Sequence, residues 1–181
     1  MFTGQTPRPS GQNARARRTR ILGIDPGTLR LGYGIVDAVG PSRLAYVECG
    51  VISASSRQAR NERLLTIGRG LGELLDEFAP DQVAMEQAFY GKNAQATLAL
   101  GEARGVALFL AADRGLSVTG YAPARVKQTI VGHGRASKSQ IAFLVRAILD
   151  MHRPPEADAA DALAIAICHA RHTPLGLPRR A

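Results

Sequence analysis

The order in which strand-like and helix-like patterns follow one another most constrains how this chain can fold. Three short runs of β-forming residues come first, closely spaced and separated by turn residues. An amphipathic helical pattern, a buried strand, an Ala- and Leu-rich helix and a further strand follow. These segments span residues 21–25, 32–37, 44–52, 60–78, 82–86, about 93–112 and about 116–121. Their order predicts an antiparallel meander that is extended by a parallel strand–helix–strand crossover.

Three more helices are predicted in the last third of the chain. They cover about 123–130, the segment from the N-cap Ser137 to Leu149, and about 156–169. Together the elements predict an α/β domain, with a mixed five-stranded sheet of three antiparallel strands followed by parallel ones and helices on both faces. We expect this domain at 20–172, between a disordered basic tail at 1–19 and a flexible C-terminal tail at 173–181.

Charge is concentrated at the ends of this 181-residue chain, whose formal net charge is +8. Five arginines in residues 1–20 and two at 179–180 have no acid among them, so the body between them is almost neutral. Such ends favour polyanionic partners, although solvated basic tails are also common. Cys49 and Cys168 lie outside any CxxC spacing, which predicts neither a disulfide framework nor a zinc site and fits a cytoplasmic protein. No apolar window reaches the roughly 18 residues of a membrane span, so no membrane partner is expected.

Two apolar strands each close on an acidic residue. The run 21–24 is apolar until Asp25, which the Pro26-Gly27 turn follows, and the run 83–85 leads into Glu86. An acid that ends a buried strand needs a partner or a cation, because an isolated charge is costly to bury. A turn or capping role is the alternative explanation for Asp25 alone. The repetition of the pattern at Glu86 favours a shared site.

Asp158 and Asp161 lie three residues apart on one face of the last predicted helix. Helix capping is the alternative for Asp158, whereas Asp161 opens an otherwise apolar run. The neighbouring alanines let this helix approach a sheet closely, so we expect both acids near the two strand ends. Four gathered carboxylates repel one another unless cations hold them, and oxygen ligands suit Mg²⁺ or Mn²⁺ better than zinc. A pair of such ions hydrolyses phosphodiesters, so we predict a metal-dependent hydrolytic site.

The four acids belong to a longer series of segments. These are Ile21–Gly27, Glu86–Phe89, Lys92-Asn93, Ala103–Ala107, Val126–Gln128, Val131-Gly132 and Ala157–Ala162. In this order they resemble the RuvC-type Holliday-junction resolvases of the ribonuclease H-like superfamily, from about Arg20 to His169. The resemblance implies a homodimer that makes two symmetric nicks in four-way DNA junctions, with a divalent metal bound by the four acids. It also implies a role in recombination and repair, with a branch-migration helicase complex as a further partner.

The same resemblance implies roles for three more residues. Phe89 matches an aromatic side chain that stacks against bases at the junction, and Lys127 and Lys138 match basic residues near the site. Some members have His at the third acidic position, where this chain has Asp158. The all-carboxylate version of the site is therefore expected here.

Other interpretations stay open from the residues alone. Each lysine also fits a solvated helix charge, and Phe89 fits a hydrophobic core. His133, between two glycines, fits a polar loop residue, a proton shuttle or a phosphate contact. A ribonuclease H-like nuclease that acts on structured RNA and a non-catalytic junction-binding module are the alternative functions. An actin-like ATPase shares the Asp-Pro-Gly turn but needs two lobes, and this chain length leaves about one domain.

Overall fold

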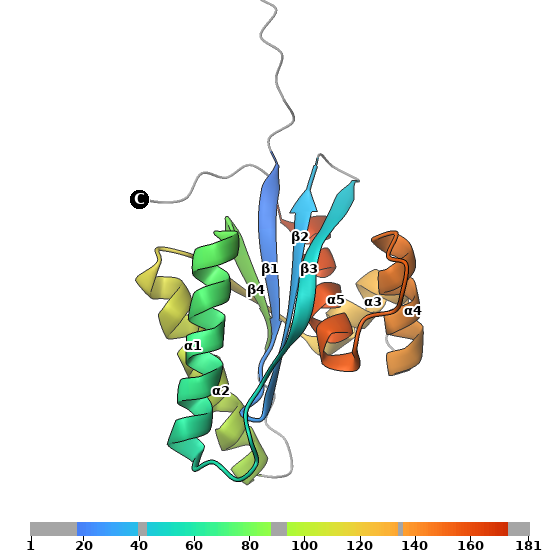
Figure 1. Ribbon diagram of the computed structural model, residues 1–181. Coiled ribbons are helices and arrows are strands. Elements are labelled where there is room, and N and C mark those ends of the chain that lie inside the picture. The colour runs from blue at the N-terminus through green and yellow to red at the C-terminus, as the bar shows by residue number, and fades with distance from the viewer. Residues whose placement is uncertain (1–17, 40–42, 88–93, 134–135, 174–181) are drawn as a thin grey trace, which may run out of the picture.

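The computed structural model describes residues 18–39, 43–87, 94–133 and 136–173. A five-stranded sheet of order β3-β2-β1-β4-β5 lies between two helical layers, with α1 and α2 on one face and α3, α4 and α5 on the other (Figure 1). The elements are β1 Thr19–Asp25, β2 Arg30–Ala38, β3 Leu44–Ser53, α1 Arg60–Phe78, β4 Gln82–Glu86, α2 Ala94–Asp113, β5 Val118–Tyr121, α3 Pro123–Val131, α4 Lys138–Ile148 and α5 Ala157–His172. The predicted fold class is confirmed, whereas the two predicted tails lie almost wholly outside the described residues.

Strand pairing confirms the predicted meander and the parallel extension. β1 pairs antiparallel with β2, β2 pairs antiparallel with β3, and β4 joins β1 and β5 in parallel. The register sets Ile24 beside Met85, so β1 and β4 finish at the same edge of the sheet. The last residues of these two strands, Asp25 and Glu86, are therefore neighbours at that edge.

Helix ends follow local chemistry, and one boundary differs from the sequence prediction. Ser137 caps α4 by accepting a hydrogen bond from the Gln140 backbone N–H at 3.2 Å, as expected. The last strand begins at Val118 rather than near Leu116. Gly115 adopts a left-handed φ of 68°, and the Leu116 N–H donates to the Ala111 carbonyl at 2.9 Å. These residues close α2, so they are not available to extend the strand.

Helix α5 lies directly on the sheet and is almost completely buried. Alanines supply much of its sheet-facing surface, and glycines of β1 and β2 supply the facing surface. A Cβ atom at Gly23 would overlap the Ala162 carbonyl oxygen, and one at Gly34 would lie 2.6 Å from the Leu163 side chain. The close approach expected from the alanines is confirmed, and it depends equally on these strand glycines.

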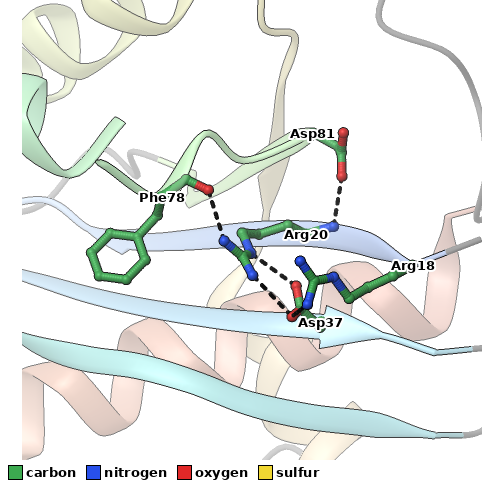
Figure 2. Close-up of polar contacts among 5 residues, drawn as sticks. All are labelled: Arg18, Arg20, Asp37, Phe78 and Asp81. Atoms are coloured by element: carbon green, nitrogen blue, oxygen red, sulfur yellow. Dashed lines mark hydrogen bonds and ion pairs between the residues drawn. The ribbon is translucent and has the colours of Figure 1, made fainter. Parts of the chain in front are cut away.

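A paired cluster of charges lies at the edge of the sheet where β1 begins (Figure 2). Arg20 donates from Nε and Nη2 to the two carboxylate oxygens of Asp37 at 2.9 and 3.1 Å. Arg18 approaches the same carboxylate at 3.1 Å. Arg20 also donates to the Phe78 carbonyl at 3.0 Å, and its backbone N–H donates to Asp81 at 2.8 Å. Buried Asp37 is thus held by two guanidinium groups.

His169, for which the sequence predicted no role, lies in the core near the same edge. Its Nε2 lies 3.0 Å from Gln82 Oε1, and its Nδ1 lies 3.0 Å from the Tyr121 hydroxyl. Burial lowers the pKa of this imidazole to about 4. A neutral His169 therefore ties α5 to β4 and β5.

Two further sequence predictions concern the cysteines and the membrane. Cys49 and Cys168 are both free thiols, as expected from their spacing. Within the described ranges, no helix combines the length and the apolar character that crossing a membrane requires.

Candidate active site

Asp25 and Glu86 face one cavity at the edge of the sheet where β1 and β4 end. The cavity has a volume of about 270 Å³, and both carboxylates are half-buried in its wall. The other lining residues come from helices α3, α4 and α5: Pro123, Val126, Lys127, Lys138, Ile141, Asp161, Ala164 and Ile165. The two strand acids that the sequence singled out thus share a site with Asp161 and with both predicted lysines.

Glycine contacts fix where the acids of α5 lie relative to the sheet. A Cβ atom at Gly32 would overlap the backbone carbonyl of Asp158, and Gly32 pairs with Asp25 in the β1–β2 ladder. The first turn of α5 therefore sits directly beside the end of β1. Asp161 lines the cavity, whereas Asp158 lies one turn earlier and is not among its lining residues.

Burial and like charges hold Asp25 partly in its protonated form. Burial raises the pKa of Asp25 to about 7, and the neighbouring carboxylates of Glu86, Asp161 and Asp158 act in the same direction. Lys138 opposes this rise. The carboxyl group thus lies in a place where negative charge exceeds the positive charge nearby.

Glu86 is affected in the same way but less strongly. Burial and the negative charge of Asp161 raise the pKa of Glu86, whereas a hydrogen bond with Asp25 and the charges of Lys138 and Lys127 act against the rise. On the far side of β4, Arg104 of α2 donates a hydrogen bond to the Glu86 backbone carbonyl. That contact anchors the end of the strand from which the Glu86 side chain projects.

Cations of the chain itself hold the two acids of α5. Lys138 Nζ lies 2.9 Å from Asp161 Oδ2. Arg30, at the start of β2, donates from Nε to Asp158 Oδ2 at 2.6 Å and from Nη2 to Glu156. Asp158 is thus engaged by a guanidinium group beside the cavity.

Metal ligation by the four acids remains a prediction. Among the residues that the structure describes, no three His, Cys, Asp or Glu side chains are grouped so that they could hold a metal ion. Asp158 and Asp161 are instead paired with Arg30 and Lys138. The chemistry of the set nevertheless fits a divalent cation, since it contains only carboxylate oxygens and its strand acids carry uncompensated charge.

The remaining predicted residues have different outcomes. Lys127 lines the cavity beside Glu86, and Phe89 lies outside the described residues. His133 is exposed and is not among the lining residues of the cavity. Sequence reasoning missed Arg30 and Arg104. For Arg30, the local sequence offers one indication of a role, a charge at the start of a strand. For Arg104, it offers only the position of the residue within the family-like segment Ala103–Ala107.

Known proteins match both the sequence and the fold of this chain. A family model described as crossover junction endodeoxyribonuclease RuvC matches residues 21–169. The chain belongs to the RuvC family of endodeoxyribonucleases. A RuvC of Rhodopseudomonas palustris is 52% identical over 153 residues, which are 84% of this chain and 87% of that protein.

Solved structures extend the RuvC match to the fold. A structure titled T. thermophilus RuvC in complex with Holliday junction substrate has a TM-score of 0.78 and 36% identity, and the match covers 84% of this chain and 93% of the other. The yeast mitochondrial Holliday junction resolvase Ydc2 matches with a TM-score of 0.62 and 17% identity, over 84% of this chain and 78% of that one. The second likeness concerns the fold alone. The predicted ribonuclease H-like fold and the predicted endonuclease family are confirmed.

Proposed function

We propose that this RuvC-family chain resolves four-way DNA junctions by paired, symmetric phosphodiester hydrolysis in recombination and repair. One observation carries the proposal: two strand-end carboxylates, Asp25 and Glu86, share a half-buried cavity with Asp161 and two lysines. Such a site suits phosphodiester hydrolysis, because its carboxylates can bind a cation and its lysines can bind a phosphate. The resemblance of the flanking segments to junction resolvases supports the choice of substrate.

A divalent cation, Mg²⁺ or Mn²⁺, is part of the proposal. Asp25, Glu86, Asp158 and Asp161 would hold it, with two ions per site. When bound, such ions supply an activated water and stabilise the leaving oxygen. The raised pKa values of Asp25 and Glu86 support this assignment, because a bound cation would stabilise the ionised carboxylates that burial and the neighbouring negative charges disfavour.

The chain's own basic and aromatic residues position the DNA in this proposal. Lys127 and Lys138 contact phosphate oxygens beside the carboxylates and offset the negative charge that develops during hydrolysis. Lys138 Nζ donates a hydrogen bond to Asp161 Oδ2 at 2.9 Å, so a phosphate contact by this lysine takes place directly beside a carboxylate of the site. Phe89 follows the Glu86 strand by three residues and stacks on a base near the branch point.

A homodimer follows from the symmetry of the proposed substrate. A four-way junction presents two equivalent strands about a two-fold axis, and two identical subunits can each cut one of them. Exposed apolar side chains on the α1 and α2 layer support such an association: Leu65, Leu98, Leu108 and Phe109. An apolar groove of about 690 Å³ lies between the same two helices. We also propose a cytoplasmic location, and a branch-migration helicase complex that delivers the junction; the latter rests on the family resemblance alone.

The decisive experiment offers the purified protein a synthetic four-way junction with and without Mg²⁺ or Mn²⁺. Nicks at matching positions in two opposed strands, formed only with metal, are the expected result. Cleavage of structured RNA with the junction left whole would replace the proposal by an RNA-processing nuclease. Binding of the junction without any cut would reduce the protein to a binding module.

A further inference from the structure

A second polar cavity lies beside the end of β1, on the α1 and α2 side of the molecule. It has a volume of about 350 Å³ and shares no lining residue with the carboxylate cavity. Its walls combine the β1–β2 turn with the N-terminal parts of α1 and α2. The described lining residues are Thr28, Arg60, Arg63, Gln95, Ala96 and Ala99. Two arginines in one small cavity indicate an anionic ligand.

Both arginines lie in the first turn of α1, together with the acidic residue Glu62. Arg60 is the first residue of the helix and Arg63 is the fourth. The positive end of a helix dipole disfavours cations in this turn and favours anions. An anion bound here would therefore interact favourably with both guanidinium groups and with the positive end of the helix dipole.

The two arginines also differ in how their groups are satisfied. Arg60 Nε lies 2.6 Å from Glu102 Oε2, so part of its charge is neutralised within the chain. Arg63 Nε is buried, yet it has no hydrogen-bond partner among the described residues. A buried donor is normally paired, and Arg63 is the residue on which a ligand can act.

We propose that this cavity binds one backbone phosphate of the DNA, with Arg63 as its main anchor and Arg60 beside it. The inference rests on the proposed function, because it takes junction DNA as the ligand. A guanidinium group suits the task, since its forked N–H groups match two oxygens of one phosphate. The phosphate supplies both the acceptor that Arg63 lacks and the negative charge that the helix end favours.

The position of the cavity sets which phosphate it takes. Thr28 follows Asp25 by three residues, so their Cα atoms lie within about 11 Å of each other even if the chain is fully extended. Successive nucleotides of one DNA strand rise by about 3.4 Å. The bound phosphate therefore belongs to a nucleotide a few positions from the bond that is cut. The cavity would set the register of the strand on the carboxylate site.

The test measures junction binding by the full chain in the absence of divalent metal, so that no cleavage occurs. Dissociation constants are taken over a range of KCl concentrations for the wild type, Arg63→Gln, Arg63→Lys and Arg43→Gln. Arg43 is an exposed arginine beside the first residue of β3, at the opposite edge of the sheet, and its substitution removes the same charge. Arg63→Gln should weaken binding and lower the slope of log Kd against log[KCl] by about one. Arg43→Gln should change neither, and Arg63→Lys should keep most of the slope.

A junction with single neutral methylphosphonate links identifies the phosphate itself. One link near the cut should weaken binding by the wild type and leave binding by Arg63→Gln unchanged, which a purely structural arginine would not produce. Equal salt slopes for Arg63→Gln and Arg43→Gln would overturn the inference, as would a lowered Tm of Arg63→Gln with a wild-type slope. A wild type that does not bind the junction would refute the proposed function instead, and the two failures are thereby distinguished.

Discussion

Strand β1 begins and ends beside charged residues, and the acids at its two ends differ in how far their charge is paired. At its start, the buried carboxylate of Asp37 is held by Arg20 and Arg18, with N–O distances of 2.9 to 3.1 Å (Figure 2). At its end, Asp25 shares a cavity with Glu86, and its pKa rises to about 7. The first arrangement fixes the fold, because its charges are paired. The second leaves charge uncompensated where a cation and a phosphate are expected to bind.

Neutralising the acid at the end of β1 or of β4 should abolish cleavage and leave the fold intact. Asp25→Asn and Glu86→Gln are each expected to lower the rate of junction cleavage about 1,000-fold or more, because each removes a ligand for the proposed metal. Junction binding should stay within a few-fold of the wild type. Single-turnover cleavage and metal-free binding measure the two effects separately.

The matched control is Asp37, which lies on β2 beside the other end of β1. Under conditions in which the Asp37→Asn variant is folded, it should cleave the junction at the wild-type rate. Metal-free Asp25→Asn should also unfold at a higher temperature than the wild type, since it removes a carboxyl group whose charged form is disfavoured by burial and by the charge of Glu86. Full cleavage by both Asp25→Asn and Glu86→Gln would refute the assignment of the site.

At the paired end, the expected effect is on stability. Asp37→Asn leaves Arg20 and Arg18 without their counter-ion, and the loss of a buried partner is expected to lower the free energy of unfolding by about 3 kcal/mol. Urea denaturation checks this value. Asp76 serves as the comparison, because its pairing with Arg114 at 2.7 Å involves a side chain that is 68% exposed. Asp76→Asn should lower the free energy of unfolding far less, because solvent screens an exposed ion pair. Equal losses in the two variants would remove the distinction between buried and exposed pairs.

The contrast also separates what the sequence could predict from what it could not. Strand acids at Asp25 and Glu86 stood out locally, because apolar runs that close on an acid are visible in the chain. The pair formed by Arg30 and Asp158 joins residues 128 positions apart, and neither neighbourhood signals the other. Likewise, the small residues of α5 were recognised, but not the strand glycines that meet them. Local patterns thus predicted the elements and the acids, whereas the partners that orient the helix acids depend on the assembled fold.

Protonation of His169 would place a positive charge in the core near the start of β4, and its cost can be measured. Its pKa is lowered to about 4 by burial, while an unfolded imidazole titrates near 6.5. Between these pH values the unfolded state binds a proton that the folded state does not, so stability is complete above about pH 6.5 and falls as the pH drops toward 4. The expected loss is about 2 to 3 kcal/mol. Urea unfolding at pH 7 and pH 4.5 should show this loss in the wild type and a smaller one in His169→Gln. Identical pH dependence in the two proteins would contradict a neutral buried histidine.

The smallest expected effect concerns Arg30. Its ion pair with Asp158 places an arginine–aspartate pair beside the carboxylate cavity, like the pair of Arg20 and Asp37 at the start of β1. Its guanidinium holds Asp158 Oδ2 at 2.6 Å, so it competes with a metal ion for that carboxylate. Arg30→Met should lower the dissociation constant of Mn²⁺ for the DNA-free protein about tenfold, as measured by electron paramagnetic resonance. Arg30→Lys keeps the charge and should stay near the wild type. Weaker Mn²⁺ binding in Arg30→Met would mean the reverse: Arg30 then orients Asp158 as a ligand, because outer-shell partners of ligands typically strengthen metal binding. The direction of the change in Mn²⁺ affinity therefore shows whether Arg30 competes with the metal for Asp158 or orients Asp158 as a ligand.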